Sequence, residues 1–473
     1  MKPHPVRGTQ RLRASRKSVQ RHRRARFAGY ARRLRLEALE DRRLLAVVTV
    51  NTDNDVLDGA TTSIANLIAS PGLDGVISLR EAITAANNTP NVGDPDEIRF
   101  NIGGGGPQTI QLQSALPAIS DAVILDGTTQ PGYAGAPIVE LNGPAGSTVL
   151  TLAADDSTIR GLAIRTSGTA VSLSGADRNL VSGLDVSWAG AGKSGLGIEI
   201  WNSSNNTLEH ITARDRRTPI QIGIQYQQDD SSGNIFRDND LSRAADWALD
   251  AQRSRGVGNQ YVRNNLSGSA NGAWFRGVAG LNLAADSFVL RDIPGTALAL
   301  WGVTGSQISG LDVSWTGAGI SGLGIEIWNS SNNTLDHITA SNRATGIYLN
   351  SSTGTSIRSS SILSNATGVS VAGASTGIVL NYNDIAGNSV HGVSNTAASN
   401  PPADVVNAGY NYWGASNGPR GPGLTGSGDA ITDRVDAIPF LGGAPLTVTN
   451  TNDSGAGSLR QAIQTANSQP GLS

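Results

Sequence analysis

The chain has 473 residues, 58 glycines, no cysteine and a formal net charge of −2. The lack of cysteine excludes disulfides and thiolate metal sites. No run of 18 uncharged apolar residues is present, so the sequence predicts no membrane span. Aromatic residues make up 5% and charged residues 16% of the chain. Short apolar segments separated by Gly, Ser, Thr and Asn are typical of many short strands and turns.

The charge is unevenly distributed along the chain. Residues 1–46 hold 15 of the 36 basic residues and three of the 38 acidic ones, so a basic leader precedes an acidic body. A basic arm can bind nucleic acid through counterion release. The acidic body argues against that partner, and we expect no nucleic acid. We interpret residues 1–46 as a targeting segment, although the apolar centre of an ordinary signal peptide is missing.

Residues 36–46, LEALEDRRLLA, resemble the LEPR-XLL motif, with Asp41 where the family has proline. That motif lies near the N-terminus of large secreted or surface proteins of certain bacteria. The resemblance implies export and a secreted or cell-surface location. It implies nothing about activity.

The body begins with a small module that starts again near the C-terminus. Residues 47–52 alternate like a strand, and residues 78–87 form an apolar helical stripe with a capping box at Ser78 and Glu81. Residues 446–451 and 458–463 repeat this strand and helix. Both copies resemble the CSLREA motif family, with Ile77 and Gly457 where the family has cysteine. We expect an N-terminal cap at 47–97 and a second, truncated module at 446–473.

A repeat occupies the region between these modules. Residues 181–216 and 308–343 are identical at 30 of 36 positions. Strand-like segments recur roughly every 24 residues, and such a period indicates a solenoid. Helical stripes and leucine-rich frames are missing, which favours a parallel β-helix of about ten turns. The expected strands begin near Ile159, Leu180, Leu208, Ile235, Tyr261, Val289, Ile308, Leu335, Ile357 and Ile378.

Asparagine directly precedes five of these strands. A turn residue at that place must tolerate the left-handed backbone conformation, as asparagine does. Stacked copies could also form an amide ladder. The five residues are Asn179, Asn206, Asn234, Asn259 and Asn333.

Residues 98–165 and the segment Asn411–Pro419 resemble turns of right-handed parallel β-helix repeat proteins, the pectate-lyase-like superfamily in its broad sense. The resemblance implies an all-β, right-handed parallel β-helix over residues 98–445. This fold carries enzymes, adhesins and inert stalks alike, so it does not select an activity.

Alternation within 196–201 predicts the candidate sugar-binding residues. Leu196, Ile198 and Ile200 are expected to point inward, which turns Glu199 and Trp201 outward. The second copy repeats this pair as Glu326 and Trp328, and we expect Trp201 and Trp328 to lie five turns apart, about 24 Å. Exposed aromatic rings can stack on sugar faces. We expect the remaining tryptophans to be packing residues: Trp188, Trp247, Trp274, Trp301, Trp315 and Trp413.

A catalytic alternative uses Asp185, Glu199 and Lys193 as the acids and base of one groove. Lys193 is the only lysine beyond the leader, and the second copy has Ile320 in its place. A duplicated site that keeps Glu and Trp but loses the lysine favours binding over catalysis.

No histidine pair has the spacing of a zinc site, so no metal site is predicted. The acidic turns 229–230 and 238–240 leave Ca²⁺ as an alternative to having no cofactor.

Three hypotheses follow from the sequence. The favoured one is an exported surface or matrix β-helix without catalytic activity that binds extracellular polysaccharide. The second is a polysaccharide lyase or hydrolase. The third is a purely structural repeat of a larger surface protein.

Overall fold

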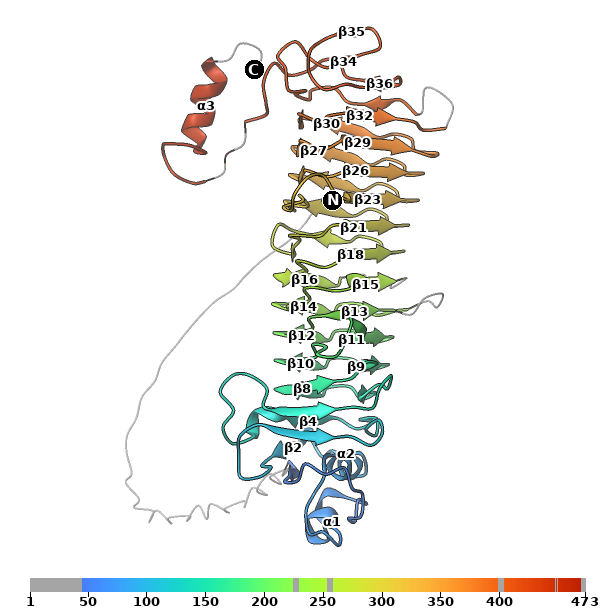
Figure 1. The fold of residues 1–473 in the computed structure, drawn as a ribbon, viewed down its shortest axis with the longest axis vertical. Helices are drawn as coiled ribbons and strands as arrows, with labels where there is room; N and C mark the ends of the chain where they lie inside the picture. Colours follow the sequence, from blue (N-terminus) through green and yellow to red (C-terminus); the bar gives the residue numbers. More distant parts are fainter. Residues whose placement is uncertain are drawn as a thin grey trace, which may run out of the picture. The chain divides into compact units, whose positions relative to one another are not determined.

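The computed structural model describes residues 45–223, 229–252, 258–398, 404–446, 448 and 450–468. The predicted leader, apart from its last two residues, lies outside this part of the chain. The strands coil through three columns of parallel strands that stack along one axis (Figure 1). The chain is a parallel β-helix, as the sequence predicts.

The first column consists of two successive parallel sheets. The eight-stranded sheet contains β1 (Val47–Val50), β2 (Asp96–Phe100), β4 (Val123–Asp126), β7 (Thr158–Arg160), β10 (Leu180–Ser182), β12 (Thr207–Glu209), β14 (Ile235–Arg237) and β16 (Gln260–Val262). The seven-stranded sheet contains β19 (Asn282–Leu283), β22 (Gln307–Ser309), β24 (Thr334–Asp336), β27 (Ser356–Arg358), β30 (Val379–Asn381), β33 (Val406–Asn407) and β36 (Val435–Asp436).

The second column is one 11-stranded parallel sheet. It contains β6 (Leu150–Leu152), β9 (Thr169–Ser174), β11 (Ser194–Trp201), β13 (Arg216–Ile222), β15 (Trp247–Gln252), β18 (Asn271–Arg276), β21 (Thr296–Trp301), β23 (Leu323–Trp328), β26 (Thr345–Asn350), β29 (Thr367–Ala372) and β32 (His391–Asn395).

The third column is broken into short parallel pieces joined by single bridges, such as those of Asp185 and Thr212. Its strands are β3 (Gln108–Gln111), β5 (Val139–Asn142), β8 (Leu162–Arg165), β17 (Asn264–Asn265), β20 (Phe288–Val289), β25 (Thr339–Ser341), β28 (Ser361–Leu363) and β31 (Asp384–Ala386). The antiparallel pair β34 (Arg420–Gly421) and β35 (Leu424–Thr425) lies near the C-terminal end of the coil.

The solenoid has about 13 turns, more than the ten predicted. The prediction began at Ile159 and ended at Ile378, whereas β2 and β4 before it and β33 and β36 after it continue the same column. The strand expected near Val289 is assigned to the wrong column. β19 stacks with β22 at that level, while Val289 belongs to the third column and is 44% exposed.

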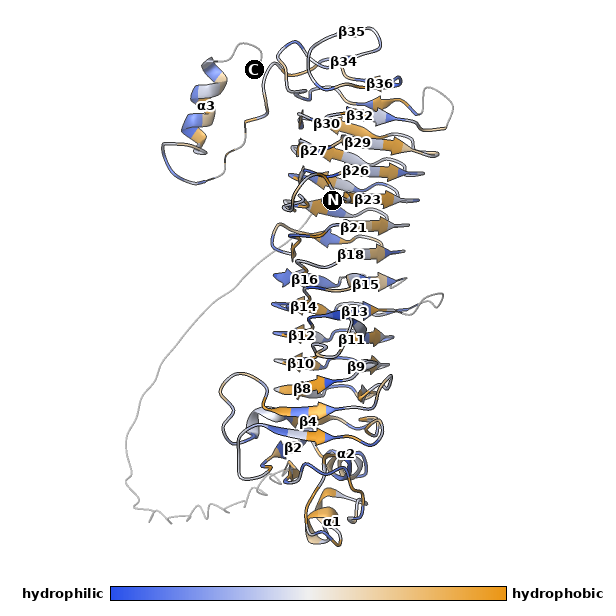
Figure 2. Cartoon of the chain, in the orientation of Figure 1, coloured by the Kyte–Doolittle hydropathy of each residue, from blue (hydrophilic) through white to orange (hydrophobic). Residues whose placement is uncertain are grey.

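The core is a continuous column of small and branched apolar side chains. In β11, Ile198 and Ile200 are fully buried and Leu196 is 8% exposed, which confirms the predicted inward positions. Because side chains alternate across a strand, the residues between them face outward. Figure 2 shows hydrophobic and hydrophilic residues side by side within single strand arrows.

The predicted amide ladder is confirmed. Each asparagine oxygen in the series accepts the backbone N–H of the residue one turn earlier, at 2.7–2.9 Å. The series runs from the Ser157 N–H through Asn179, Asn206 and Asn234 to Asn259. Asn333 accepts the Ser306 N–H in the same way, at 3.0 Å.

The predicted left-handed conformation of these asparagines is wrong. The positive φ falls on the preceding residue, for example Arg178 (57°), Asn205 (58°) and Asn332 (56°). In the ladder, asparagines such as Asn206 use both the side-chain oxygen and their own N–H, and none of the five has a positive φ. The residue before each asparagine therefore makes the turn.

The N-terminal cap contains α1 (Ile64–Ala69) and α2 (Leu79–Asn87), whereas the 3-10 turn η1 (Gly127–Thr129) follows β4 in the solenoid. Ser78 and Glu81 form the predicted capping box, and Leu79 and Ile83 are buried. The second copy forms only α3 (Leu459–Ser468), which has no buried residue. Its predicted strand at 446–451 is wrong where the chain is described, because residues 446, 448 and 450 are not in a strand.

Each copy of the duplicated unit ends in a buried arginine that donates hydrogen bonds to backbone carbonyls of earlier residues. Arg216 is fully buried and donates to the carbonyls of Val186 (2.5 Å) and Thr166 (2.6 Å). Arg343 is equally buried and donates to the carbonyls of Val313 (2.7 Å) and Ile293 (2.6 Å) in the second copy. Each guanidinium thus satisfies backbone carbonyls that would otherwise be buried without a partner.

Candidate functional site

The outer face of the 11-stranded sheet carries a group of partly exposed tryptophans together with the carboxyl groups of Glu199, Asp250 and Glu326. Its register puts outward residues of successive strands in line. One column along β11, β13, β15 and β18 is Glu199, Gln221, Asp250 and Trp274. The same column continues through Ala299 to Glu326 and Tyr348 in β21, β23 and β26.

Five aromatic rings form a continuous row across this face. Their centroids are 5.6, 5.4, 5.6 and 6.2 Å apart in sequence order. All five are neither fully buried nor fully exposed, and they come from five consecutive strands. Strand spacing makes the row about 19 Å long. The rings belong to Trp247, Trp274, Trp301, Trp328 and Tyr348.

A polar cluster adjoins the β11 end of this aromatic row. Gln252 donates from Nε2 to Asp250 Oδ2 at 2.6 Å, and both residues are 7% exposed. Burial raises the pKa of Asp250 to about 6, and nearby Asp246 raises it further, against the opposing effects of the Gln252 hydrogen bond and of Arg217 and Arg276. Asp250 therefore titrates close to neutrality.

The cluster also contains buried polar atoms without a hydrogen-bond partner. Two are acceptors, Asp250 Oδ1 and Gln252 Oε1, and two are donors, the Nε1 groups of Trp201 and Trp274. Leaving such a group unpaired costs about 1–3 kcal/mol each, so these four groups on β11, β15 and β18 call for a partner.

At the other end of the row, the polar groups of Glu326 and Trp328 are hydrogen-bonded to each other. Trp328 donates from Nε1 to Glu326 Oε1 at 2.8 Å. Burial raises the pKa of Glu326, and this hydrogen bond opposes the rise. Arg276 lies over the Trp301 ring, with Cζ 6.0 Å from the centroid, which is a cation–π distance.

The structure places all four predicted sugar-contacting residues on this outer face. Glu199 and Trp201 lie on β11, and Glu326 and Trp328 lie on β23, five strand spacings away. Glu199 accepts a long hydrogen bond of 3.4 Å from Ser172 on the neighbouring strand. What these residues bind stays a prediction.

The three residues of the catalytic alternative are not gathered on one sheet. Asp185 lies in the third column, where Arg165 pairs with it at 2.6 Å. Burial opposes ionisation of Asp185, but the Arg165 and Ser187 hydrogen bonds lower its pKa overall. Lys193 is exposed just before β11, whereas Glu199 faces outward from that strand.

Sequence reasoning missed most of the aromatic row. The prediction that Trp247, Trp274 and Trp301 are packing residues is not contradicted, because all three are only partly exposed and their rings contact one another. Trp413 is fully buried, as expected. The signal was present in the alternation of residues 296–301, Thr-Ala-Leu-Ala-Leu-Trp, which turns Trp301 outward just as 196–201 turns Trp201.

The acidic turns considered for Ca²⁺ are engaged with the chain itself. Asp229 accepts the Asn202 N–H at 2.6 Å, Asp238 pairs with Arg263 at 2.7 Å, and Asp240 pairs with Arg214. Among the described residues, no group of three or more His, Asp or Glu side chains is placed to hold a metal ion. Ca²⁺ binding stays a prediction.

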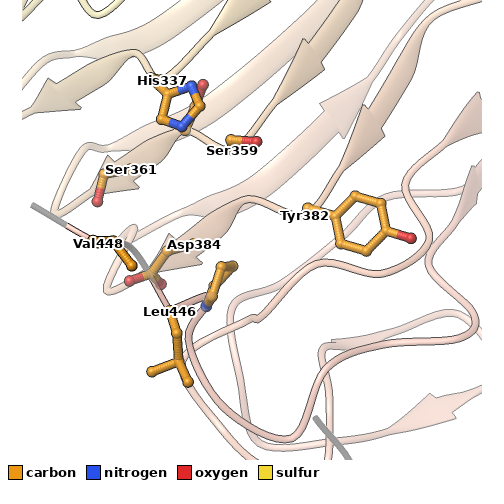
Figure 3. Close-up of a pocket in the computed structure, with 9 residues that line it drawn as sticks. His337, Ser359, Ser361, Tyr382, Asp384, Leu446 and Val448 are labelled. Carbon is orange, nitrogen blue, oxygen red and sulfur yellow. The ribbon is translucent and has the colours of Figure 1, made fainter. Parts of the chain in front are cut away.

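A separate hollow of about 410 Å³ lies near the C-terminal end of the coil (Figure 3). Its lining includes His337, Ser361, Asp384 and the chain segment at Leu446. His337 pairs instead with Asp336 at 3.0 Å. No hydrogen bond joins the His337, Ser361 and Asp384 side chains, all of them described.

Fold and site together define a right-handed β-helix repeat protein with an aromatic row on one sheet. The family described as "Right handed beta helix region" matches residues 147–302. The family described as "Periplasmic copper-binding protein (NosD)" matches residues 279–410. No protein in the curated set matches the sequence.

Several solved structures are similar at low identity. A Dettilon tailspike protein is 14% identical, with 75% of this chain and 68% of that chain covered and a TM-score of 0.48. The A-module of a mannuronan C-5 epimerase from Azotobacter vinelandii is 13% identical, with 76% and 95% covered and a TM-score of 0.35. The catalytic domain of an alpha-1,3-glucanase in complex with nigerose is 13% identical, with 85% and 69% covered and a TM-score of 0.36.

The residues do not fit a copper site of the kind that one family description names. Copper prefers imidazole and sulfur ligands. Residues 279–410 contain two histidines, His337 and His391, and the only methionine in the chain is Met1. The described part of this range contains no cluster of three candidate ligands.

Proposed function

We propose that this chain is an exported, polysaccharide-binding β-helix protein whose ligand lies along the row Trp247–Tyr348. The row of five contacting rings carries the proposal. Rings held at 5.4–6.2 Å from one another on successive strands form a rigid apolar strip that costs little conformational entropy to present. An extended sugar chain offers matching apolar faces along its length.

The rest of the proposal rests on weaker features. The LEPR-XLL-like leader supports export to the cell surface or matrix. Among the described helices, none combines the length and apolarity needed to cross a membrane. We propose a binding module without catalysis, because the duplicated unit keeps Glu and Trp but not the lysine.

The test is retention of the full chain on a panel of immobilised polysaccharides. Trp301→Ala removes the central ring of the row and should abolish retention on the polymer that binds the wild type. Trp315→Ala is the matched control, because Trp315 lies in a loop outside the row and donates to Ala318 O at 3.3 Å. Failure of every polymer to retain the wild type would leave the purely structural repeat.

Hydrolysis is the second candidate function, and one observation favours it. Glu199 and Asp250 lie two strands apart in the same column, about 9.6 Å at the backbone. The two carboxyl groups of inverting glycosidases are about 6.5–9.5 Å apart, which side chains on such strands can reach. Asp250, protonated up to about pH 6, could donate to a leaving oxygen while Glu199 accepts a proton from water. New reducing ends that appear with wild type but not with Asp250→Asn would establish this activity.

A further inference from the structure

The polar cluster beside the β11 end of the row consists of Trp201, Asp250, Gln252 and Trp274, and it contains both hydrogen-bond donors and acceptors without a partner. Asp250 Oδ1 and Gln252 Oε1 can only accept while Asp250 is ionised, and the indole nitrogens of Trp201 and Trp274 can only donate. Asp250 and Trp274 are register partners on β15 and β18, and Gln252 is two residues from Asp250 on the same face. The unpaired donors thus lie on β11 and β18, and the unpaired acceptors lie on β15 between them.

A group that both donates and accepts hydrogen bonds is the natural complement of such a mixture. Hydroxyl groups do so, whereas a carboxylate only accepts and an ammonium only donates. A sugar ring also presents C–H faces to aromatic side chains, and here the cluster directly continues into the Trp274–Trp301 contact of 5.4 Å.

Among the described residues, the charges at this end disfavour an anionic ligand; Arg253 and Arg255, which follow Gln252 in the sequence, lie outside the described part of the chain. The described charged groups around the cluster are three carboxyls and two guanidinium groups: Glu199, Asp246, Asp250, Arg217 and Arg276. Arg276 already lies over the Trp301 ring. A polyuronate brings one carboxylate per sugar, and the described part of the cluster has no surplus cation to meet it.

We infer that this end of the row is a subsite for neutral sugars, with hydroxyl groups bonded to Asp250, Gln252, Trp201 and Trp274. The inference rests on the proposed polysaccharide binding and names its ligand class.

The test is calorimetric titration of the full chain with two sets of hexasaccharides. The neutral set is cellohexaose, maltohexaose and mannohexaose, and the anionic set is hexagalacturonate and hexamannuronate. Trp201→Phe and Trp274→Phe each keep an aromatic ring and remove one N–H donor. Trp315→Phe makes the same change outside the row and serves as the control.

The expected result is binding of at least one neutral hexasaccharide and none of the anionic ones. Each of the two cluster variants should weaken that binding about fivefold, the size of one hydrogen bond, while the control stays within about twofold. Circular dichroism would verify that the variants are folded.

Two results would overturn the inference. Binding of uronates alone, lost in Trp301→Ala, would leave polysaccharide binding intact and reject the neutral class. Neutral binding that both cluster variants leave unchanged would show that the four atoms serve only the fold, for example through bound water. Absence of binding to every hexasaccharide and every immobilised polymer would instead reject the proposed function itself.

Discussion

The two copies of the duplicated unit have nearly the same sequence but different surroundings. Residues 181–216 and 308–343 place Glu and Trp at the same outward positions of β11 and β23. In the second copy, Trp328 lies between Trp301 and Tyr348 and donates to Glu326. In the first copy, the Trp201 nitrogen is buried without a partner, and no ring contact of Trp201 occurs within the described residues.

The difference shows that a repeat unit does not define its own site. Each strand contacts only the turns before and after it. The neighbours of β23 supply aromatic rings, whereas β13 and β15 beyond β11 supply Gln221, Asp250 and Gln252. Similar strands therefore form an aromatic strip at one end and a polar cluster at the other.

The largest expected effect is a loss of stability when the buried arginine of either copy is replaced. Arg216→Met and Arg343→Met each leave buried backbone carbonyls unpaired, so each should lower the free energy of unfolding by about 3 kcal/mol or more. Urea unfolding followed by circular dichroism would measure it. Because the two arginines make corresponding contacts, losses that differ severalfold between the variants would show that the copies are not structurally equivalent.

The second prediction compares Asp250 with Glu326, the two carboxyl groups of the outer face whose pKa is raised. The pKa of Asp250 is raised by burial from 3.8 to about 6, so the folded state holds its proton where the unfolded state has lost it. Stability from this group is therefore lost as pH rises from about 4 to 6, by about 2–3 kcal/mol. Asp250→Asn should remove that loss and be more stable than wild type at pH 7.

Glu326→Gln provides the comparison for Asp250→Asn. Burial also raises the pKa of Glu326, but the side chain is less buried and accepts from Trp328, so its pH effect should have the same sign and be smaller. The measurement is the urea midpoint of both variants between pH 4 and 8. An Asp250→Asn curve parallel to wild type would contradict the assignment.

A third prediction compares the duplicated tryptophans in ligand binding. Trp328→Ala removes a ring flanked on both sides in the row, and should weaken sugar binding about 30-fold, or about 2 kcal/mol. Trp201→Ala should cost only about fivefold, since it removes one donor and a ring outside the row. Titration with the ligand found for the wild type would measure both. Equal losses would argue that the row extends to β11.

The smallest expected effect concerns a residue that differs between the copies. Lys193 is exposed and Ile320 is 49% exposed. Exchanging them as Lys193→Ile and Ile320→Lys should each change stability by less than about 0.5 kcal/mol. The same variants should leave sugar binding unchanged. If a polymer-cleaving activity were lost in Lys193→Ile alone, the lysine would again be a candidate catalytic base.

The sequence by itself determined the repeat and the direction of its side chains. Alternation in 196–201 predicted which side chains are buried, and the Ser78–Glu81 spacing predicted the capping box of α2. These features depend on φ, ψ and contacts within a few residues, so the local order of residue types is sufficient to define them.

Only the tertiary structure decided which outward residues meet. Trp274 and Trp301 are 27 residues apart in the chain and in contact because the loop between them brings β18 and β21 into register. Likewise, the α3 sequence resembles that of α2, yet Leu459 is 60% exposed where Leu79 is buried. The missing information is the length and path of each turn, which sets the neighbours that every strand receives.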